Sequence, residues 1–458
     1  MNRKMLVLNV AALSPWEIGP DCPTFESLSN GGALRAMTAP EPALTCPSHA
    51  TMLTGLEPRD HGIVANGWYD VDAAQVSNWG RSDRLVTGEK IWEAAKRRAP
   101  DFKTVNLFWR FCTHSSAEIT LTERPTYFAN GRKGADVYGQ PQTFRDSVSA
   151  ELGSFPFFHF WGPKAGLPSS KWIVDVARKA LRDEAPDLLL CYAPGLDYEV
   201  QRFGPKSDAA RGALRQGDDI YRPLIEDALN ADMDVCVVSD YGFTTVDRAV
   251  FPNRILRDAG YITIDPAVNG ALLEPGASRA FAVCDNQAAH IYVRDPEDLA
   301  DVRALLLSAD GIRDVLGPDS SDSVCLGHRR SGQLLAIAEP DTWFAYPYWT
   351  DAREEPDFAH CVDIFRKPGF DPCELFLRQG ASGKAHMVKR FLQLKTGIRA
   401  PFDVISTDTS LIRGSRNIRP ESDADGAVML TSWRQDDTGV LPMSALKQLL
   451  LQRMFEGA

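Results

Sequence analysis

The stretch VVSDYGF, residues 237–243, ends an apolar run with Asp240, Tyr241 and Gly242. An apolar run that stops at a carboxylate and a glycine is typical of a buried parallel strand. Open α/β sheets hold their chemistry just beyond the carboxyl ends of such strands. The stretch therefore predicts an α/β fold with a site at Asp240. Whether Asp240 holds a metal ion, and why a phenol follows it, are the questions that the rest of the sequence must answer.

Short apolar runs alternate with helical patterns along much of the chain. The predicted strands are 5–10, 104–109, 187–193 and 234–240, and the predicted helices are 24–30, 46–54, 88–98, 170–184 and 220–230. This alternation favours an α/β fold, a doubly wound and mainly parallel sheet with helices on both faces. A compact α+β pattern late in the chain predicts an inserted smaller cap domain.

The predicted domain organisation is a core in three parts with two insertions. The core comprises residues 1–107, 166–276 and 346–458, and it ends in an amphipathic helix that docks on the sheet. Residues 108–165 form an aromatic-rich insertion, and residues 277–345 form the α+β cap subdomain.

Composition limits the classes of partner. The 458 residues carry a formal charge of −11, which argues against a nucleic-acid polymer as partner. A small anionic substrate remains compatible, because a local pocket can oppose the global sign. The nine cysteines show no paired spacing, which indicates reduced thiols and a cytoplasmic location. No apolar run is long enough to span a membrane, so no membrane partner is expected, and the oligomeric state is left open.

The second informative stretch is PALTCPSHATMLTGL, residues 42–56. Thr45 is a good N-cap, Pro47 suits a first helical turn, and Gly55 suits the position after a helix. Thr45 would then lie at the positive end of a helix starting at Cys46. Its hydroxyl either caps that helix or acts as a nucleophile whose negative charge the helix end stabilises. Cys46 is a weaker alternative nucleophile, because a helix start lowers a thiol pKa only where the thiol is exposed.

The residues that follow, EPRDHGIVANGWYD, complete a long match to a known pattern. With the preceding helix they resemble the type I phosphodiesterase and nucleotide pyrophosphatase branch of the alkaline phosphatase superfamily. The residues that carry the resemblance are Thr45, Pro47, His49, Thr54, Gly55, Leu56, Pro58, His61, Gly62, Ile63 and Asn66. It implies that Thr45 is the covalent nucleophile and that Asn66 contacts a phosphoryl oxygen. His49 and His61 do not fall on metal-ligand positions, and packing and loop hydrogen bonds are the favoured interpretation for both.

The same resemblance implies two zinc-like ions, and this chain departs from the family's ligand pattern at several places. Asp197 and Asp240 keep their positions. The expected aspartate of the first strand is Asn9, and the expected histidines are Gln201, Tyr241 and Arg416. A group of bacterial, phosphodiesterase-like proteins resembles this chain over nearly its whole length and shares the Gln and Tyr changes.

The altered ligands change the expected cofactor. Oxygen donors suit Mg²⁺ or Ca²⁺ better than zinc, so we expect one divalent cation or none, held by Asp197 and Asp240. Asn9 and Gln201 become candidate substrate-binding residues. A guanidinium repels a nearby dication, so Arg416 is expected in place of one metal. The alternative is a dead site in which Arg416 and Asp197 form a plain salt bridge.

Three functions compete at the sequence level. The first is a hydrolase of phosphate esters or diesters with Thr45, Asn66, Tyr241 and Arg416 in catalytic roles. The second is acid–base chemistry on a non-phosphate metabolite in the same cleft, with the aromatics of residues 155–161 lining a pocket or simply forming core. The third is a non-catalytic binding protein.

Overall fold

The computed structural model describes residues 2–129, 133–320, 325–396, 398 and 400–456. Its centre is a nine-stranded sheet in the order β23-β2-β22-β11-β1-β10-β5-β6-β9. The strands are β1 Lys4–Val10, β2 Ala33–Thr38, β5 Thr104–Leu107, β6 Ile119–Glu123, β9 Val137–Gln140, β10 Leu188–Ala193, β11 Met233–Val238, β22 Ala427–Thr431 and β23 Leu441–Pro442. The middle strands β11, β1, β10, β5 and β6 run parallel, while β22 and β9 pair antiparallel. The α/β fold with a large, centrally parallel sheet is confirmed.

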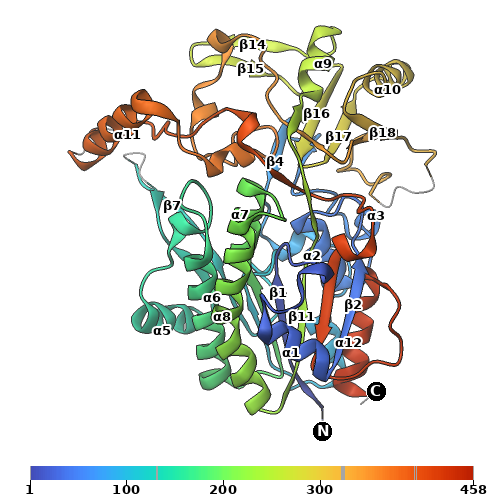
Figure 1. Ribbon diagram of the computed structural model, residues 1–458. Helices are drawn as coiled ribbons and strands as arrows, with labels where there is room; N and C mark the ends of the chain where they lie inside the picture. Colours follow the sequence, from blue (N-terminus) through green and yellow to red (C-terminus); the bar gives the residue numbers. More distant parts are fainter. Residues whose placement is uncertain (1, 130–132, 321–324, 397, 399, 457–458) are drawn as a thin grey trace.

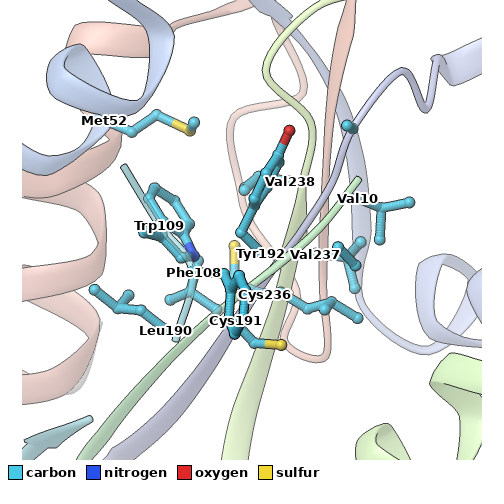
Figure 2. Packing of buried hydrophobic residues seen from close by; sticks show 14 of the residues in the cluster. Val10, Met52, Phe108, Trp109, Leu190, Cys191, Tyr192, Cys236, Val237 and Val238 are labelled. Carbon is cyan, nitrogen blue, oxygen red and sulfur yellow. The ribbon is translucent and has the colours of Figure 1, made fainter. Parts of the chain in front are cut away.

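The central strands are continuous apolar runs because both of their faces are covered. All six residues of β10 are buried. In register, Asn9 of β1 lies between Tyr192 of β10 and Val238 of β11. Figure 2 shows the side chains of these strands packed together, with Met52 approaching from a neighbouring helix. The parallel register brings the ends of three strands to one edge of the sheet.

Two groups of helices pack on the sheet (Figure 1). The first group is α1 Pro23–Gly31, α5 Gln142–Leu152, α6 Leu167–Glu184, α7 Gly195–Phe203 and α8 Asp208–Asn230. The second group is α2 Thr45–Thr54, α4 Ile91–Arg98 and the C-terminal α12 Leu446–Phe455. Helix α8 begins twelve residues before its predicted start, because Ser207 caps it by accepting a hydrogen bond from the Ala210 N–H. The predicted terminal helix is confirmed and buries Leu446, Leu450, Leu451 and Met454.

A second, antiparallel sheet lies at one end of the molecule in the order β16-β17-β19-β18. Its strands are β16 Ala280–Asp285, β17 Ala288–Val293, β18 Ile312–Leu316 and β19 Leu334–Ala338, with α10 Leu299–Leu307 beside β18. Strand β20 Thr342–Phe344 then pairs with β13 Arg248–Val250. The hairpin between β16 and β17 turns at Asn286 and Gln287, which carries its tip back toward the main sheet.

The remaining elements are small and connect these layers. Residues 108–165 supply β6, β9 and α5, so part of this aromatic-rich range extends the main sheet. Other short elements are α3 Pro58–His61, β3 Gly67–Asp70, β4 Gln75–Asn78, β7 Thr126–Tyr127, β8 Lys133–Gly134, α9 Pro252–Asp258, β14 Ile264–Ala267 and β15 Gly270–Leu273. Late in the chain lie α11 Gly380–Lys395 and β21 Gly414–Arg416, which pairs with β12 Phe243–Thr245.

Candidate active site

The ends of the central strands and one late strand place the candidate residues. Asn9 is in β1, and Asp240 and Tyr241 follow β11 after Ser239. Gly242 follows because a Cβ at this position would lie 1.8 Å from the Asp425 carbonyl oxygen. Strand β21 then pairs Arg416 with Phe243, two residues beyond Tyr241. Residues distant in sequence are therefore brought to one buried location.

Helix α2 presents Thr45 to this location. The helix begins at Thr45 itself, with Leu44 as its N-cap, so the expectation that Thr45 caps a helix starting at Cys46 is one residue off and its hydroxyl makes no capping bond. Asn66 serves the helix start instead, because its Oδ1 accepts the Cys46 N–H at 2.9 Å. The Thr45 hydroxyl is left for other partners, and the Asn66 amide keeps its two N–H donors.

A chain of side-chain hydrogen bonds runs from Thr45 to Asp197. The Thr45 Oγ1 lies 3.3 Å from the Tyr241 hydroxyl, which donates to Asp197 Oδ1 at 3.1 Å. Gln201 Nε2 donates to the second oxygen of Asp197 at 2.5 Å. All four side chains are buried. Burial raises the pKa of the Asp197 carboxyl above its ordinary value, and it raises that of Tyr241 far above.

Arg416 lies beside this chain, between two aromatic rings. Its Nε is 3.6 Å from Asp197 Oδ1, and both side chains are 3% exposed. Its guanidinium carbon is 4.5 Å from the centre of the Tyr241 ring and 5.1 Å from that of Phe370. Burial opposes the charge, but Tyr241, Asp197 and Asp285 together raise the Arg416 pKa, so Arg416 remains a cation.

Asp240 has an unexpected neighbour in His49. The His49 Nε2 lies 3.4 Å from Asp240 Oδ2 and 2.9 Å from the Asn9 amide. Its Nδ1 accepts the Arg110 N–H at 3.0 Å, so the remaining ring proton is on Nε2, where the Asp240 carboxylate, and not the Asn9 amide nitrogen, can accept it. Burial lowers the pKa of His49, which keeps the ring neutral. His49 thus makes the packing and hydrogen-bond contacts predicted for it, directly under the candidate site.

Several buried polar atoms at this location make no hydrogen bond within the described part of the chain. They are Asn9 Oδ1, Gln201 Oε1, both carboxylate oxygens of Asp240, and Arg416 Nε and Nη1. Buried groups of this kind ordinarily have partners, so this cluster is suited to receiving a polar ligand. Among the described residues, no group of three or more His, Cys, Asp or Glu side chains could hold a metal ion.

The β16–β17 hairpin contributes a residue that the sequence reasoning missed. Asp285 is buried, and burial raises its pKa to about 6 against the opposing charge of Arg416. Its Oδ1 accepts from Asn286 Nδ2 at 2.7 Å, and the Asn286 Oδ1 lies 3.3 Å from the Arg416 N–H and from the Ser415 hydroxyl. The sequence signal was Asp-Asn-Gln between two apolar strands, which is typical of a tight hairpin; Asn286 has the positive φ of 56° that such turns favour.

The environment of Cys46 does not suit it to act as the alternative nucleophile. Its thiol is 1% exposed, and burial raises its pKa to about 11. The helix start does not compensate for this burial. The Cys46 thiol is therefore not an activated nucleophile.

Comparisons with known proteins identify relatives of the chain. A family model described as type I phosphodiesterase / nucleotide pyrophosphatase matches residues 5–371. The human ectonucleotide pyrophosphatase/phosphodiesterase family member 7 is 24% identical over 298 residues, which cover 60% of this chain and 58% of the human protein. An uncharacterized pyrophosphatase/phosphodiesterase of Schizosaccharomyces pombe is 27% identical over 211 residues, covering 44% of this chain and 36% of that protein. The chain thus spans three fifths or less of the length of these relatives.

Solved structures show the same fold. Phosphonoacetate hydrolase from Sinorhizobium meliloti, in complex with phosphonoformate, has a TM-score of 0.63 at 12% identity, over 98% of this chain and 96% of that one. Human ectonucleotide pyrophosphatase / phosphodiesterase 5 has a TM-score of 0.58 at 14% identity, over 99% and 95%. At these identities the likeness concerns the fold alone.

Proposed function

The chain belongs to the type I phosphodiesterase / nucleotide pyrophosphatase family, and from this premise we propose that it hydrolyses a phosphate ester or diester with Thr45 as its nucleophile. The observation that supports this most is the buried chain from Thr45 through Tyr241 to Asp197, with Arg416 beside it. A small anionic substrate follows from the proposed reaction.

The proposed first step is attack of the Thr45 oxygen on phosphorus. The new O–P bond forms as the bond to the leaving alkoxide breaks. The Thr45 proton passes to the Tyr241 oxygen while the Tyr241 proton passes to Asp197, so that Tyr241 stays neutral. A carboxylate with a raised pKa is a better base than an ordinary one, and burial raises the pKa of Asp197. The proton on Asp197 or one from solvent neutralises the leaving alkoxide. Water then hydrolyses the phosphothreonine formed from a monoester, or the phosphothreonine ester formed from a diester, and its proton restores the Thr45 hydroxyl as phosphate or a phosphate monoester leaves.

Negative charge on the phosphoryl oxygens would be met by three groups. The N-terminus of α2 supplies a positive dipole end, although the Cys46 N–H is already bonded to Asn66 and the Ser48 N–H to Leu44. Asn66 keeps its amide N–H donors, since its oxygen already accepts from Cys46. Arg416 supplies a permanent positive charge, and its Nη1 makes no hydrogen bond within the described part of the chain. Donors fixed in a buried site in this way stabilise developing charge more strongly than water does.

We further propose that Arg416 stands in place of a metal ion. The residues do not fit a pair of zinc ions, because Asp197 is already engaged by Gln201, Tyr241 and Arg416. At 3.6 Å from Asp197, the guanidinium would repel a dication bound to that carboxylate. Asp240 and Asn9 retain free oxygens, so at most one hard cation suits this donor set.

The test combines a substitution with chemical trapping. Thr45→Ala should abolish hydrolysis of bis-p-nitrophenyl phosphate, and mass spectrometry of the acid-quenched wild type should find a p-nitrophenyl phosphoryl group on Thr45, because only one p-nitrophenolate leaves in the first step. Thr54→Ala is the matched control, because that buried hydroxyl bonds only within the same helix and its turn. Unchanged hydrolysis by Thr45→Ala would reject the nucleophile. Elemental analysis showing about two zinc ions per chain would reject Arg416 as a replacement, and phosphate binding without turnover would favour a non-catalytic role.

A further inference from the structure

Helix α11 projects from the body of the molecule at the left of the view in Figure 1, above β7. Its sequence, GASGKAHMVKRFLQLK, contains three lysines, one arginine and no acidic residue. The whole chain, in contrast, carries a formal charge of −11. This helix is therefore a local basic element on an acidic protein.

One face of α11 is fixed against the chain that follows it. His386 Nε2 and Arg390 Nε lie 2.8 Å and 2.7 Å from Asp403 Oδ1. Arg390 Nη2 donates to the other carboxylate oxygen at 3.0 Å. Because positions four apart lie on the same face of a helix, these bonds define the inner face and set the rotation of the helix.

The outer face carries large apolar side chains. Val388, Phe391 and Leu392 are 55%, 59% and 55% exposed, and their spacing of three and four places them together. Exposed lysines at 384, 389 and 395 border them. Within the described residues, none of these lysines has an acidic side chain within salt-bridge distance. We call this surface, made of Lys384, Val388, Lys389, Phe391, Leu392 and Lys395, the outer face of α11.

We propose that the outer face of α11 binds an anionic membrane surface peripherally. An apolar face bordered by lysines is the pattern of helices that lie in the interfacial region of a bilayer. Anionic headgroups attract the lysines, while Val388, Phe391 and Leu392 enter the boundary with the acyl chains. The acidic remainder of the protein is repelled by the same surface, which orients the molecule with α11 toward the lipid.

A second copy of the chain is a poorer occupant of this face. In a two-fold contact the same surface meets itself, so the lysines of one outer face would oppose those of the other. The proposal also differs from a transmembrane segment: no helix within the described residues has the length and apolar character to cross a bilayer.

The test is flotation of the whole protein with lipid vesicles of defined composition. We expect binding to vesicles of phosphatidylcholine with 30% phosphatidylglycerol, weak binding to phosphatidylcholine alone, and release by salt. Replacing Lys384, Lys389 and Lys395 by Gln should weaken binding about 100-fold, since each basic residue near such a surface contributes about fivefold. Phe391→Ser with Leu392→Ser should weaken it at least tenfold.

Phe158→Ser is the matched control, because this phenylalanine is 57% exposed but lies outside α11. It should bind vesicles like the wild type, and thermal melting should show every variant folded. Failure of the wild type to float with anionic vesicles at low salt would overturn the proposal. So would equal binding by the α11 variants, or a wild-type dimer that Phe391→Ser with Leu392→Ser converts to monomer, which would assign the face to a second copy.

Discussion

Substitution of Arg416 should destabilise the protein, because the buried Asp197 carboxylate then lacks its counter-charge. Its Nε lies 3.6 Å from Asp197 Oδ1 with both side chains 3% exposed. Two unit charges at this distance attract by about 5 kcal/mol at an effective dielectric constant of about 20. Arg416→Gln loses this attraction, and Asp197 responds by taking up a proton. We therefore expect a net loss of about 3–5 kcal/mol in the free energy of unfolding, as when one partner of a buried pair is removed.

A double-mutant cycle isolates the pair. Urea unfolding is measured for Arg416→Gln, Asp197→Asn and the double variant, and the double variant should lose clearly less stability than the two single losses added together. Arg419→Gln is the control, because its ion pair with Glu41 at 2.7 Å is partly exposed and should contribute at most about 1 kcal/mol. Simple additivity of the two single losses would refute a coupled pair, and an equal loss for Arg419→Gln would show that burial does not decide the magnitude.

Three further predictions concern the same region. Tyr241→Phe should lower turnover about 10²- to 10⁴-fold with little change in substrate affinity, because it breaks the link between Thr45 and Asp197; steady-state kinetics measures both. The pKa of Asp285 is about 6 in the folded protein and 3.8 in the unfolded chain. The folded protein therefore loses about 3 kcal/mol of stability as the pH rises from about 4 to 6. Asp285→Asn should remove this loss, which urea unfolding at a series of pH values measures. All nine cysteines are buried, so a thiol reagent should leave the native protein, including Cys46, unlabelled and should label nine thiols in denaturant.

The central sheet could be predicted because each of its main strands is a short apolar run that is recognisable in the local sequence. Residues 5–8 and 235–238, which precede Asn9 and Asp240, are all apolar, so they indicate strands buried on both faces. The parallel register of these strands then brings their ends together. Glycine at 242 follows from the same geometry, since the Asp425 backbone leaves no space for a side chain. The family resemblance placed Thr45 and Arg416 in the same candidate site. Hydrophobic periodicity alone would not have predicted that these two residues lie close together.

Contacts between distant segments could not be predicted in the same way. His49 shows no metal-ligand spacing, and only the packing of α2 against the end of β11 brings it to Asp240. Asp285 reaches the site through a hairpin from another sheet, and nothing local in its sequence specifies where that hairpin docks. Helix α11 was not predicted, because several of its apolar side chains are exposed. The apolar residues of a helix in a folded domain are ordinarily expected to pack on the core.

The position of Arg416 in the chain has a consequence for biosynthesis. The parallel strands β1, β10 and β11, and with them Asp197 and Asp240, are complete by residue 240. Arg416, which among the described residues supplies the positive charge beside Asp197, lies much later in the chain. A nascent or prematurely terminated polypeptide would therefore enclose two acidic groups without their counter-charge. Such fragments should stay open and sensitive to proteases, so that synthesis of the segment around Arg416 decides whether the earlier part persists.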